Sequence, residues 1–277
     1  MLSYRHAYHA GNHADVLKHC VWLCCLEYLQ RKETGLRIID THSGAGLYSL
    51  TAEREKNREF DTGIGKIYNQ PNLPEPLAHY LASVRESNRK TLALYPGSPL
   101  LTSHRLRPQD ELWLHELHGA DHALLRKNLQ GKKRVYVKCE DGFAGLRALV
   151  PPPTRRALVL IDPSYEIKSD YQKVAEALTQ ASRRFASGCY LLWYPVVDRA
   201  RIDTLEKQLR QSGIGGIQLF ELGVRPDSPG HGMTASGMIV VNPPWTLWSQ
   251  MEETLPWLAA ELGENGQGYY RQETISE

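Results

Sequence analysis

The chain has 277 residues, of which 42% are hydrophobic and 23% charged, with a formal net charge of +2. This length and composition fit one large globular α/β domain, and the near balance of charge disfavours a general polyanion binder. No apolar run approaches the roughly 18 residues of a membrane span, and the first residues lack the apolar core of a signal peptide. The 5 cysteines form no CxxC pair, which favours reduced thiols and a cytoplasmic location.

The segment 4–19 is rich in histidine, asparagine and aromatic residues. Asn12 is predicted to cap a buried helix over 15–31, because an acidic residue follows it at capping-box spacing and apolar residues then recur at helical spacing. His9 and His13 are four residues apart, but the acidic partner of zinc motifs is missing. We therefore expect no metal site here, and instead a polar arm that contacts substrate.

A short apolar stretch at 36–40 is predicted to be the first strand, and it runs into a glycine-rich turn that contains Gly44 and Gly46. Glycines in such a turn let the backbone approach a ligand closely with free N–H groups. The third glycine of the dinucleotide fingerprint is absent. The two glycines predict a ligand-binding turn mainly because they follow the first strand. A helix-like segment is expected to follow the turn.

Residues 50–110 interrupt the alternation of strands and helices. Prolines precede a predicted helix over 77–88, and Ser98 between Gly97 and Pro99 is expected in a turn. We interpret 50–110 as a mainly helical insertion.

The next two predicted strands, 112–116 and 135–142, both end in acidic residues. Glu116 after the second strand is placed like the acid that binds ribose hydroxyls in nucleotide-binding folds. Asp141 after the third strand could accept a hydrogen bond from an adenine amine, although a helix cap explains a single aspartate equally well. Acids also follow the first and fourth strands, so the set is Asp40, Glu116, Asp141 and Asp162.

The apolar run at 157–161 is typical of a central strand buried on both faces, and it ends at Asp162-Pro163-Ser164-Tyr165. Open α/β sheets bind ligands at such carboxyl ends. The Asp162 carboxylate and the Pro163 carbonyl are two acceptors beside the Tyr165 ring, which suits a planar ring with an exocyclic NH2. Acceptors that orient this amine favour its attack on an activated carbon. An ordinary strand end with a helix-capping aspartate explains the four residues equally well.

The remaining chain continues the alternation of helices and strands. In chain order the predicted elements are a helix capped by Ser169, a strand at 189–194, a helix ending near Gly213, two closing strands at 217–224 and 237–241, and an amphipathic helix over 247–262. The polar tail after Gly263 is expected to be loose.

Two further patterns have an uncertain bearing on function. The tetrad Asn242-Pro243-Pro244-Trp245 is chemically similar to the first one, but its place at the end of the sheet disfavours a catalytic role. Basic clusters could meet phosphates or simply be solvated surface charge. These clusters are Lys132, Lys133, Arg134 and Lys138; Arg155 and Arg156; and Arg183 and Arg184.

Asp162-Pro163-Ser164-Tyr165 resembles the Asp-Pro-Pro-Tyr motif of amino-group methyltransferases that use S-adenosylmethionine, and 40–46 is similar to their cofactor-binding motif. More closely, the chain resembles the bacterial RlmJ family, which methylates N6 of an adenine in 23S ribosomal RNA. The stretches that carry this resemblance are 2–6, 11–19, 95–99, 193–197 and 233–238. One departure is Ser164, where the motif has proline; the acceptors and the ring are all present.

The resemblance implies a Rossmann-like class I methyltransferase fold, with a seven-stranded, mostly parallel sheet and helices on both faces. It implies a single domain over 1–277, with an N-terminal arm and helix at 1–33 and the insertion at about 50–110. The partner would be 23S ribosomal RNA, naked or in an early assembly particle, and the enzyme would be a cytoplasmic monomer without metal or membrane contact. The product would be S-adenosylhomocysteine.

The resemblance also implies roles for single residues. Asp162, Pro163 and Tyr165 would be catalytic, with Tyr165 stacked on the flipped base. Tyr4, His6 and Lys18, with Tyr165, would contact RNA. The cofactor would be bound by His19, His42, Gly44, Gly46, Ser98, Glu116, Asp141, Gly142 and Asp162.

Three alternatives remain open on the sequence alone. A DNA adenine-N6 methyltransferase would use the same tetrad, although no DNA-reading module is evident. A non-catalytic RNA- or nucleotide-binding protein would bind S-adenosylmethionine weakly or not at all. A histidine-rich metal hydrolase is the third, and metal analysis would test it.

Overall fold

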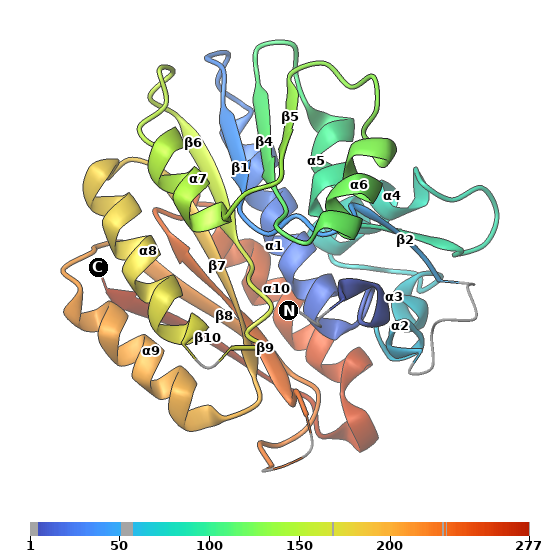
Figure 1. Cartoon of the computed structure of the whole chain (residues 1–277). Coiled ribbons are helices and arrows are strands. Elements are labelled where there is room, and N and C mark those ends of the chain that lie inside the picture. Colours follow the sequence, from blue (N-terminus) through green and yellow to red (C-terminus); the bar gives the residue numbers. More distant parts are fainter. Residues whose placement is uncertain (1–4, 51–57, 168, 229, 231, 277) are drawn as a thin grey trace.

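The computed structural model describes residues 5–50, 58–167, 169–228, 230 and 232–276. Within them, eight strands form one sheet in the order β10-β8-β9-β7-β6-β1-β4-β5 (Figure 1). The five strands from β5 to β7 are parallel, and β9, β8 and β10 continue the sheet antiparallel. The strands are β1 (Arg37–Asp40), β4 (Glu111–His115), β5 (Val135–Lys138), β6 (Ala157–Ile161), β7 (Cys189–Val196), β8 (Ile217–Gly223), β9 (Ala235–Val241) and β10 (Tyr269–Ser276).

Helices cover both faces of this sheet (Figure 1). Leu158 and Leu160 of β6 point into the core beneath α1 and α10, whereas Val159 and Ile161 point into the core beneath α8 and α9. The predicted strand buried on both faces and the Rossmann-like α/β class are thus confirmed. The longer helices are α1 (His13–Leu29), α4 (Glu75–Arg85), α5 (Ser98–Arg105), α6 (Gly119–Asn128), α7 (Gly142–Leu149), α8 (Asp170–Arg184), α9 (Arg199–Gln211) and α10 (Leu247–Leu262).

Helix α1 is buried on all sides over residues 14–26. Its start is as predicted, because the Asn12 side chain accepts a hydrogen bond from the Asp15 backbone N–H at 3.1 Å. The Asp15 carboxylate in turn accepts one from the Gly11 N–H at 2.8 Å. Since the helix has no solvated face, its charged side chains must find partners inside the protein.

The turn after β1 leads into a strand, so the predicted helix there is wrong. Gly44 and Gly46 adopt φ values of +58° and +75°, a left-handed conformation that favours glycine. The chain then forms β2 (Leu47–Ser49), which pairs antiparallel with β3 (Leu94–Pro96).

The segment between these two strands is mainly helical, with α2 (Glu59–Thr62), α3 (Ile64–Ile67) and α4 among its described residues. Helix α4 confirms the predicted helix. The turn expected at Ser98 is wrong, because Ser98 begins α5 and Pro99 occupies the first turn, where the missing N–H is not needed.

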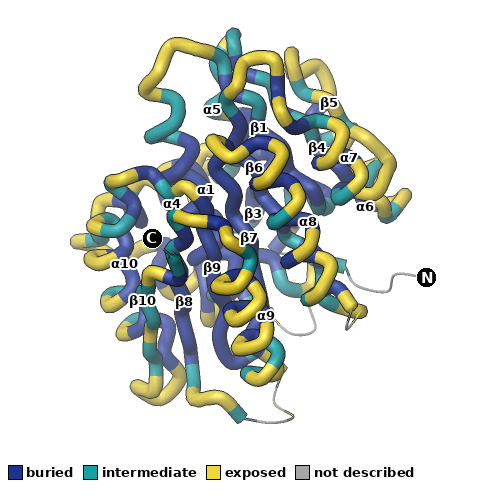
Figure 2. Tube along the Cα trace, turned by 90° about the vertical axis from the view of Figure 1, so that its left-hand side faces the viewer, coloured by how far each residue is buried: buried dark blue, intermediate teal, exposed yellow. Residues whose placement is uncertain are grey.

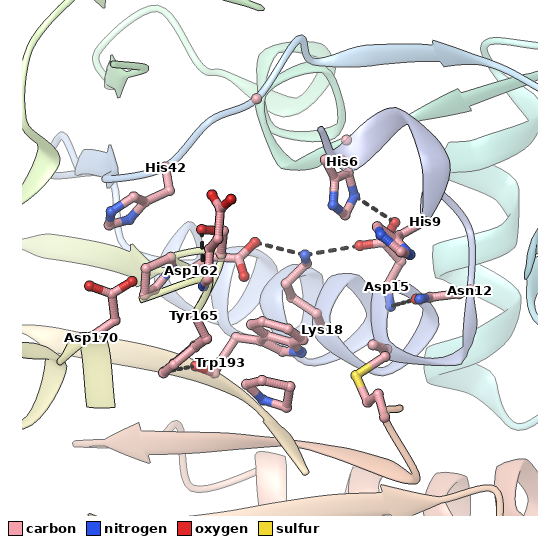
Figure 3. A pocket seen from close by; sticks show the side chains of 18 of the residues that line it. His6, His9, Asn12, Asp15, Lys18, His42, Asp162, Tyr165, Asp170 and Trp193 are labelled. Atoms are coloured by element: carbon pink, nitrogen blue, oxygen red, sulfur yellow. Dashed lines mark hydrogen bonds and ion pairs between the residues drawn. The ribbon is translucent and has the colours of Figure 1, made fainter. Parts of the chain in front are cut away.

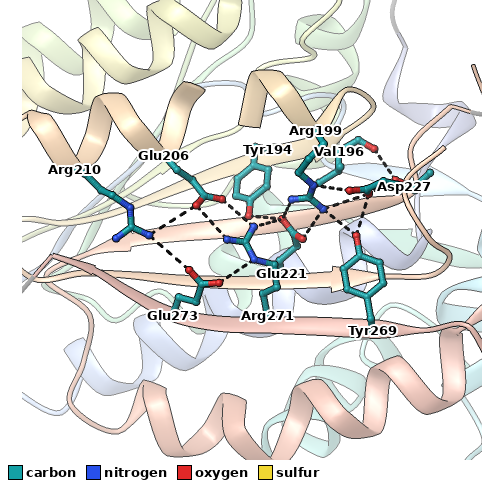
Figure 4. A network of polar contacts seen from close by, with 11 residues as sticks. Tyr194, Val196, Arg199, Glu206, Arg210, Glu221, Asp227, Tyr269, Arg271 and Glu273 are labelled. Atoms are coloured by element: carbon teal, nitrogen blue, oxygen red, sulfur yellow. Dashed lines mark hydrogen bonds and ion pairs between the residues drawn. The ribbon is translucent and has the colours of Figure 1, made fainter. Parts of the chain in front are cut away.

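Strand β10 makes the sheet eight-stranded, so the predicted count of seven and the loose tail after Gly263 are both wrong. It pairs antiparallel with β8. Arg271 of β10 contacts Glu206 of α9 at 2.9 Å, and the fully buried Glu221 of β8 accepts two 2.8 Å bonds from Arg199 (Figure 4). Because charged contacts hold this edge together, hydropathy does not reveal the strand.

Strands β8 and β9 pair antiparallel as the predicted hairpin. Strand β9 is also antiparallel to β7, so its carboxyl end lies at the edge of the sheet opposite to that of β6. Asn242 there donates 2.7 Å bonds to the carbonyls of Ala186 and Gly188. The second tetrad is therefore far from the first and closes a turn. None of the described helices is both long and apolar enough for a membrane span.

Candidate active site

A cavity of about 990 Å³ opens at the carboxyl ends of the parallel strands, where α/β folds of this type bind ligands. Gly46 does not line it; a Cβ there would lie 2.8 Å from Leu125. Tyr4 lies outside the described residues. The other predicted site residues all line the cavity: His6, Lys18, His19, His42, Gly44, Ser98, Glu116, Asp141, Gly142, Asp162, Pro163 and Tyr165.

A chain of charged contacts crosses the cavity floor (Figure 3). Lys18 Nζ donates a 2.7 Å bond to Asp162 Oδ2 and lies 2.9 Å from Asp15 Oδ1. Asp15 Oδ2 also contacts His6 Nε2 at 2.9 Å. Lys18 is thus held between two carboxylates, one on its own helix and one at the end of β6.

Burial and charge set the protonation of this chain. Burial opposes the charge of Lys18, but Asp15 and Asp162 outweigh it and raise the pKa of Lys18. Burial likewise works against ionised Asp15, yet His6 and Lys18 bring its pKa well below the usual range. Burial raises the pKa of Asp162, and Lys18 limits this rise. Lys18 therefore favours the carboxylate form of Asp162.

Tyr165 occupies the wall beside Asp162. Its hydroxyl donates a 2.6 Å bond to the Trp193 carbonyl, and its ring centroid lies 4.5 Å from that of Tyr171. Its φ of +53° is unusual for a bulky residue, and such backbone outliers cluster at functional sites. The loop that follows β6 thus places an aromatic ring in the cavity next to the carboxylate.

Asp40 lies just beneath the cavity. The Ser98 hydroxyl donates a 2.7 Å bond to Asp40 Oδ2, and the His42 N–H donates a 3.2 Å bond to Oδ1. Burial, opposed by the Ser98 bond and reinforced by the nearby charge of Asp162, raises the pKa of Asp40 to about 7. Asp40 thus positions Ser98. The two residues are 58 positions apart, so the sequence alone does not indicate this contact.

Glu116 fixes the glycine turn. Its carboxylate accepts a 2.8 Å bond from the Gly44 N–H and a 2.6 Å bond from the His118 N–H, and burial raises its pKa. One acid thus links the end of β4 to the turn after β1.

Asp141 caps α7, accepting bonds from the backbone N–H groups of Phe143 at 2.7 Å and Ala144 at 3.3 Å. Within the protein, Asp141 is therefore a helix cap, which was one of its two predicted roles. A Cβ on Gly142 would lie 1.9 Å from the Thr41 carbonyl oxygen, so glycine allows α7 to begin against the β1 end.

Two histidines on the walls are neutral, the buried His19 and the half-buried His42. His19 Nδ1 lies 2.7 Å from the Tyr95 hydroxyl, and burial lowers the pKa of His19 to about 3. Burial also lowers the pKa of His42 to about 4, and its ring packs edge-on against Phe143.

The first described residues fold back over the cavity. His9 Nδ1 lies 2.9 Å from Glu59 Oε1, and the Asn12 amide donates a 2.9 Å bond to Glu59 Oε2. Across the described part of the chain, no group of three or more His, Cys, Asp or Glu side chains is arranged to hold a metal ion. The contacts of His9 are those of an arm tied to α2.

Some functional neighbours were not among the predicted site residues. Asp15 is one; the sequence indicates it only as the acid of a helix cap, and its i,i+3 spacing from Lys18 is the signal of their ion pair. Tyr171 and Trp193 are others; they pack around Tyr165, and Trp193 lies in the stretch 193–197 that carries the family resemblance.

This sheet, with the glycine turn after β1 and a ligand cavity at the carboxyl ends of its parallel strands, defines a class I methyltransferase, and the Asp-Pro-Ser-Tyr loop after β6 resembles the motif of those that act on amino groups. The family model described as Ribosomal RNA large subunit methyltransferase D, RlmJ, matches residues 33–276, and the chain belongs to this family. It is thus an enzyme, an S-adenosylmethionine-dependent ribosomal RNA methyltransferase.

Relatives resemble the chain over its whole length. Ribosomal RNA large subunit methyltransferase J of Haemophilus influenzae is 49% identical over 279 residues, covering 100% of this chain and 99% of the relative. Its Escherichia coli namesake is 49% identical over 271 residues, covering 97% of each. A crystal structure of a Legionella pneumophila protein matches with a TM-score of 0.89 and 36% identity, over 96% of this chain and 98% of the other.

The cavity fits S-adenosylmethionine on physical grounds. The sulfonium of this cofactor is a cation, and a positively charged wall would repel it. His19 and His42 are neutral at physiological pH because their pKa values are lowered to about 3 and about 4. The ammonium of Lys18 is offset by its two carboxylate partners.

Proposed function

We propose that this enzyme transfers a methyl group from S-adenosylmethionine to N6 of a specific adenine in 23S ribosomal RNA. The observation that carries the proposal is the position of Asp162, a half-buried carboxylate at the end of β6 that lines the cavity beside Pro163 and the Tyr165 ring. This set of groups matches an aromatic amine, and family membership supports ribosomal RNA as the substrate.

In this proposal, residues at the carboxyl ends of β1, β4 and β5 would hold the cofactor. When bound, it supplies an electrophilic methyl group. Glu116 is placed to accept hydrogen bonds from ribose hydroxyls, and Asp141 from the adenine amine of the cofactor. The residues that would hold the cofactor are His19, His42, Gly44, Ser98, Glu116, Asp141, Gly142 and Asp162, all of which line the cavity, whereas Gly46 would act only by shaping the turn.

The target adenine must leave its stack to reach the cavity, as enzymes acting on bases require. Tyr165 then stacks on the base. Asp162 and the Pro163 carbonyl accept the two N6–H bonds, which directs the nitrogen lone pair toward the methyl group. Asp162 must be ionised to accept the hydrogen bond from N6 and, after transfer, the proton that leaves N6. Lys18 maintains Asp162 in this carboxylate form.

Lys18, His6 and Tyr4 are proposed to contact the RNA or close over it. The whole chain would act as one domain and one monomer in the cytoplasm, without metal or membrane contact, on naked 23S RNA or an early assembly particle.

The test is transfer of a labelled methyl group to unmodified 23S RNA, followed by nucleoside mass spectrometry. We expect N6-methyladenosine from the wild type and none from Asp162→Ala, with cooperative unfolding of the variant as the control. Methylation of DNA but not RNA would overturn the substrate, and full activity of Asp162→Ala would overturn the role of that carboxylate.

A further inference from the structure

We propose that the exposed edge of the sheet at β5 docks the stretch of ribosomal RNA next to the target adenine. This inference rests on the proposed function and adds to it a surface outside the cavity. The surface, referred to below as the β5 edge, comprises Arg126, Lys127, Lys132, Lys133, Tyr136 and Lys138.

Positive charge is concentrated there. Residues 122–139 contain six basic residues and no acidic residue, although the whole chain carries only +2. Arg134 contacts Glu111 at 3.1 Å. The five basic residues of the β5 edge form no ion pair with any described residue, and all five are exposed. Exposed backbone along α6 can be followed in Figure 2. Unneutralised lysines and arginines in a row are what a phosphate backbone requires.

An aromatic ring stands among these charges. Val135 and Val137 pack against the core, so the alternation of the strand turns Tyr136 to the other face. Trp113 of β4 stacks on Tyr136 with ring centroids 4.4 Å apart, yet Tyr136 remains 37% exposed. Lys138 Nζ lies 5.8 Å from the Trp113 ring. A supported ring beside cations is a stacking platform for an unpaired base.

The β5 edge is continuous with the active site. Strand β5 is the last strand of the sheet order, and the chain passes from Lys138 directly to Asp141 and Gly142, which line the cavity. From Lys138 back to Lys132 the chain extends about 20 Å at most. RNA whose flipped adenine occupies the cavity can therefore follow β5 away from it.

Lysines on an edge strand also prevent pairing with other chains. That role does not require an exposed aromatic ring, and it leaves RNA methylation unchanged when the lysines are removed. The two roles therefore give different results in one assay.

The experiment measures methylation of unmodified 23S RNA by the full chain over a range of RNA concentrations and at several salt concentrations. The variants are Lys132→Ala/Lys133→Ala, Tyr136→Ala and Tyr136→Phe. The matched control is Arg183→Ala/Lys207→Ala, which removes the same two charges from the exposed faces of α8 and α9.

We expect KM for RNA to rise with little change in kcat. Tyr136→Ala should raise it roughly tenfold, and Tyr136→Phe should restore it because stacking needs only the ring. In the double lysine variant, the slope of log KM for RNA against log salt concentration should fall by about 2, or about 1 for each lysine. Affinity for S-adenosylmethionine should be unchanged.

Equal KM values and salt slopes for the lysine variant and its control would overturn the β5 edge while leaving the proposed function intact. Failure of the wild type itself to methylate 23S RNA would instead overturn the proposed function, and with it this surface.

Discussion

Lys18 and Asp162 are separated by 144 residues in the sequence, and Lys18 Nζ lies 2.7 Å from Asp162 Oδ2 in the structure. The lysine belongs to a helix buried on every side, and the aspartate ends the central strand of the sheet. This contact joins the N-terminal helix to the residue proposed to orient the target amine.

Lys18→Met should make the reaction depend on higher pH. Burial raises the pKa of Asp162 and Lys18 limits the rise, so removing the ammonium raises this pKa further. Since the carboxylate form is required, activity falls as pH falls through the pKa of Asp162, and in the variant this loss begins at higher pH. The measurement is kcat against pH with saturating RNA; superimposable profiles for variant and wild type would contradict the effect.

The same variant should lose stability. The buried Asp15 and the half-buried Asp162 would be left without their shared cation, and breaking a buried ion pair typically costs about 3 kcal/mol or more. Denaturant unfolding at pH 7 measures the free energy of unfolding directly. Lys207→Met, at an exposed position of α9, is the control and should change it little.

Asp40→Asn should remove a pH dependence of stability. Burial raises the pKa of Asp40 to about 7 from the ordinary value of 3.8, so the folded state binds this proton more tightly than the unfolded chain does. The stabilisation is complete below the unfolded pKa and is lost as pH rises through the folded pKa. The difference between wild type and variant should thus change by up to about 1.4 kcal/mol per pH unit in that window. Unfolding measured at pH 4, 5.5 and 8 tests this; a constant difference would show that Asp40 titrates normally.

Gly142→Ala should disturb the cofactor side of the cavity. The new Cβ would lie 1.9 Å from the Thr41 carbonyl oxygen, so α7 must shift away from β1. We expect a cost of about 1–3 kcal/mol in stability and a higher KM for S-adenosylmethionine. Gly119→Ala is a matched control, because Gly119 also begins a helix and no described atom lies within 4 Å of its Cβ position. If both variants bind the cofactor equally well, the close approach at Gly142 is not needed.

Arg199→Ala should destabilise the protein without altering the chemistry. Glu221 is fully buried and accepts two bonds from Arg199, so the variant leaves a buried carboxylate with fewer partners. About 3 kcal/mol is expected, seen as a lower denaturant midpoint. At a temperature where the variant is folded, kcat should match that of the wild type; a large drop in kcat would link this network to the active site.

Local patterns predicted local structure well. Asn12 begins its helix as expected because a side-chain cap involves only neighbouring residues. Asp162 could be placed at the cavity because an apolar run followed by proline ends a buried strand. The class followed from the tetrad at 162–165 and the glycine turn at 40–46, and the family from the stretches 2–6, 11–19, 95–99, 193–197 and 233–238.

Other features depend on partners distant in sequence. Strand β10 is polar, and only its pairing with β8 and its contacts with α9 make it a strand. Ser98 looked like part of a turn because its bond to Asp40 forms only when α5 packs against β1. The cation that holds Asp162 could not be predicted, since no spacing rule connects a helix to a strand end so far along the chain.

The burial of α1 has a consequence for biosynthesis. This helix packs against β9 and α10, which leave the ribosome long after it does. Its apolar surface therefore lacks its final partners while most of the chain is synthesised. Apolar surface that is exposed in this way favours aggregation. The nascent chain cannot bring Lys18 to its final setting until the last third has been synthesised, so docking of the first helix should be among the last steps of folding.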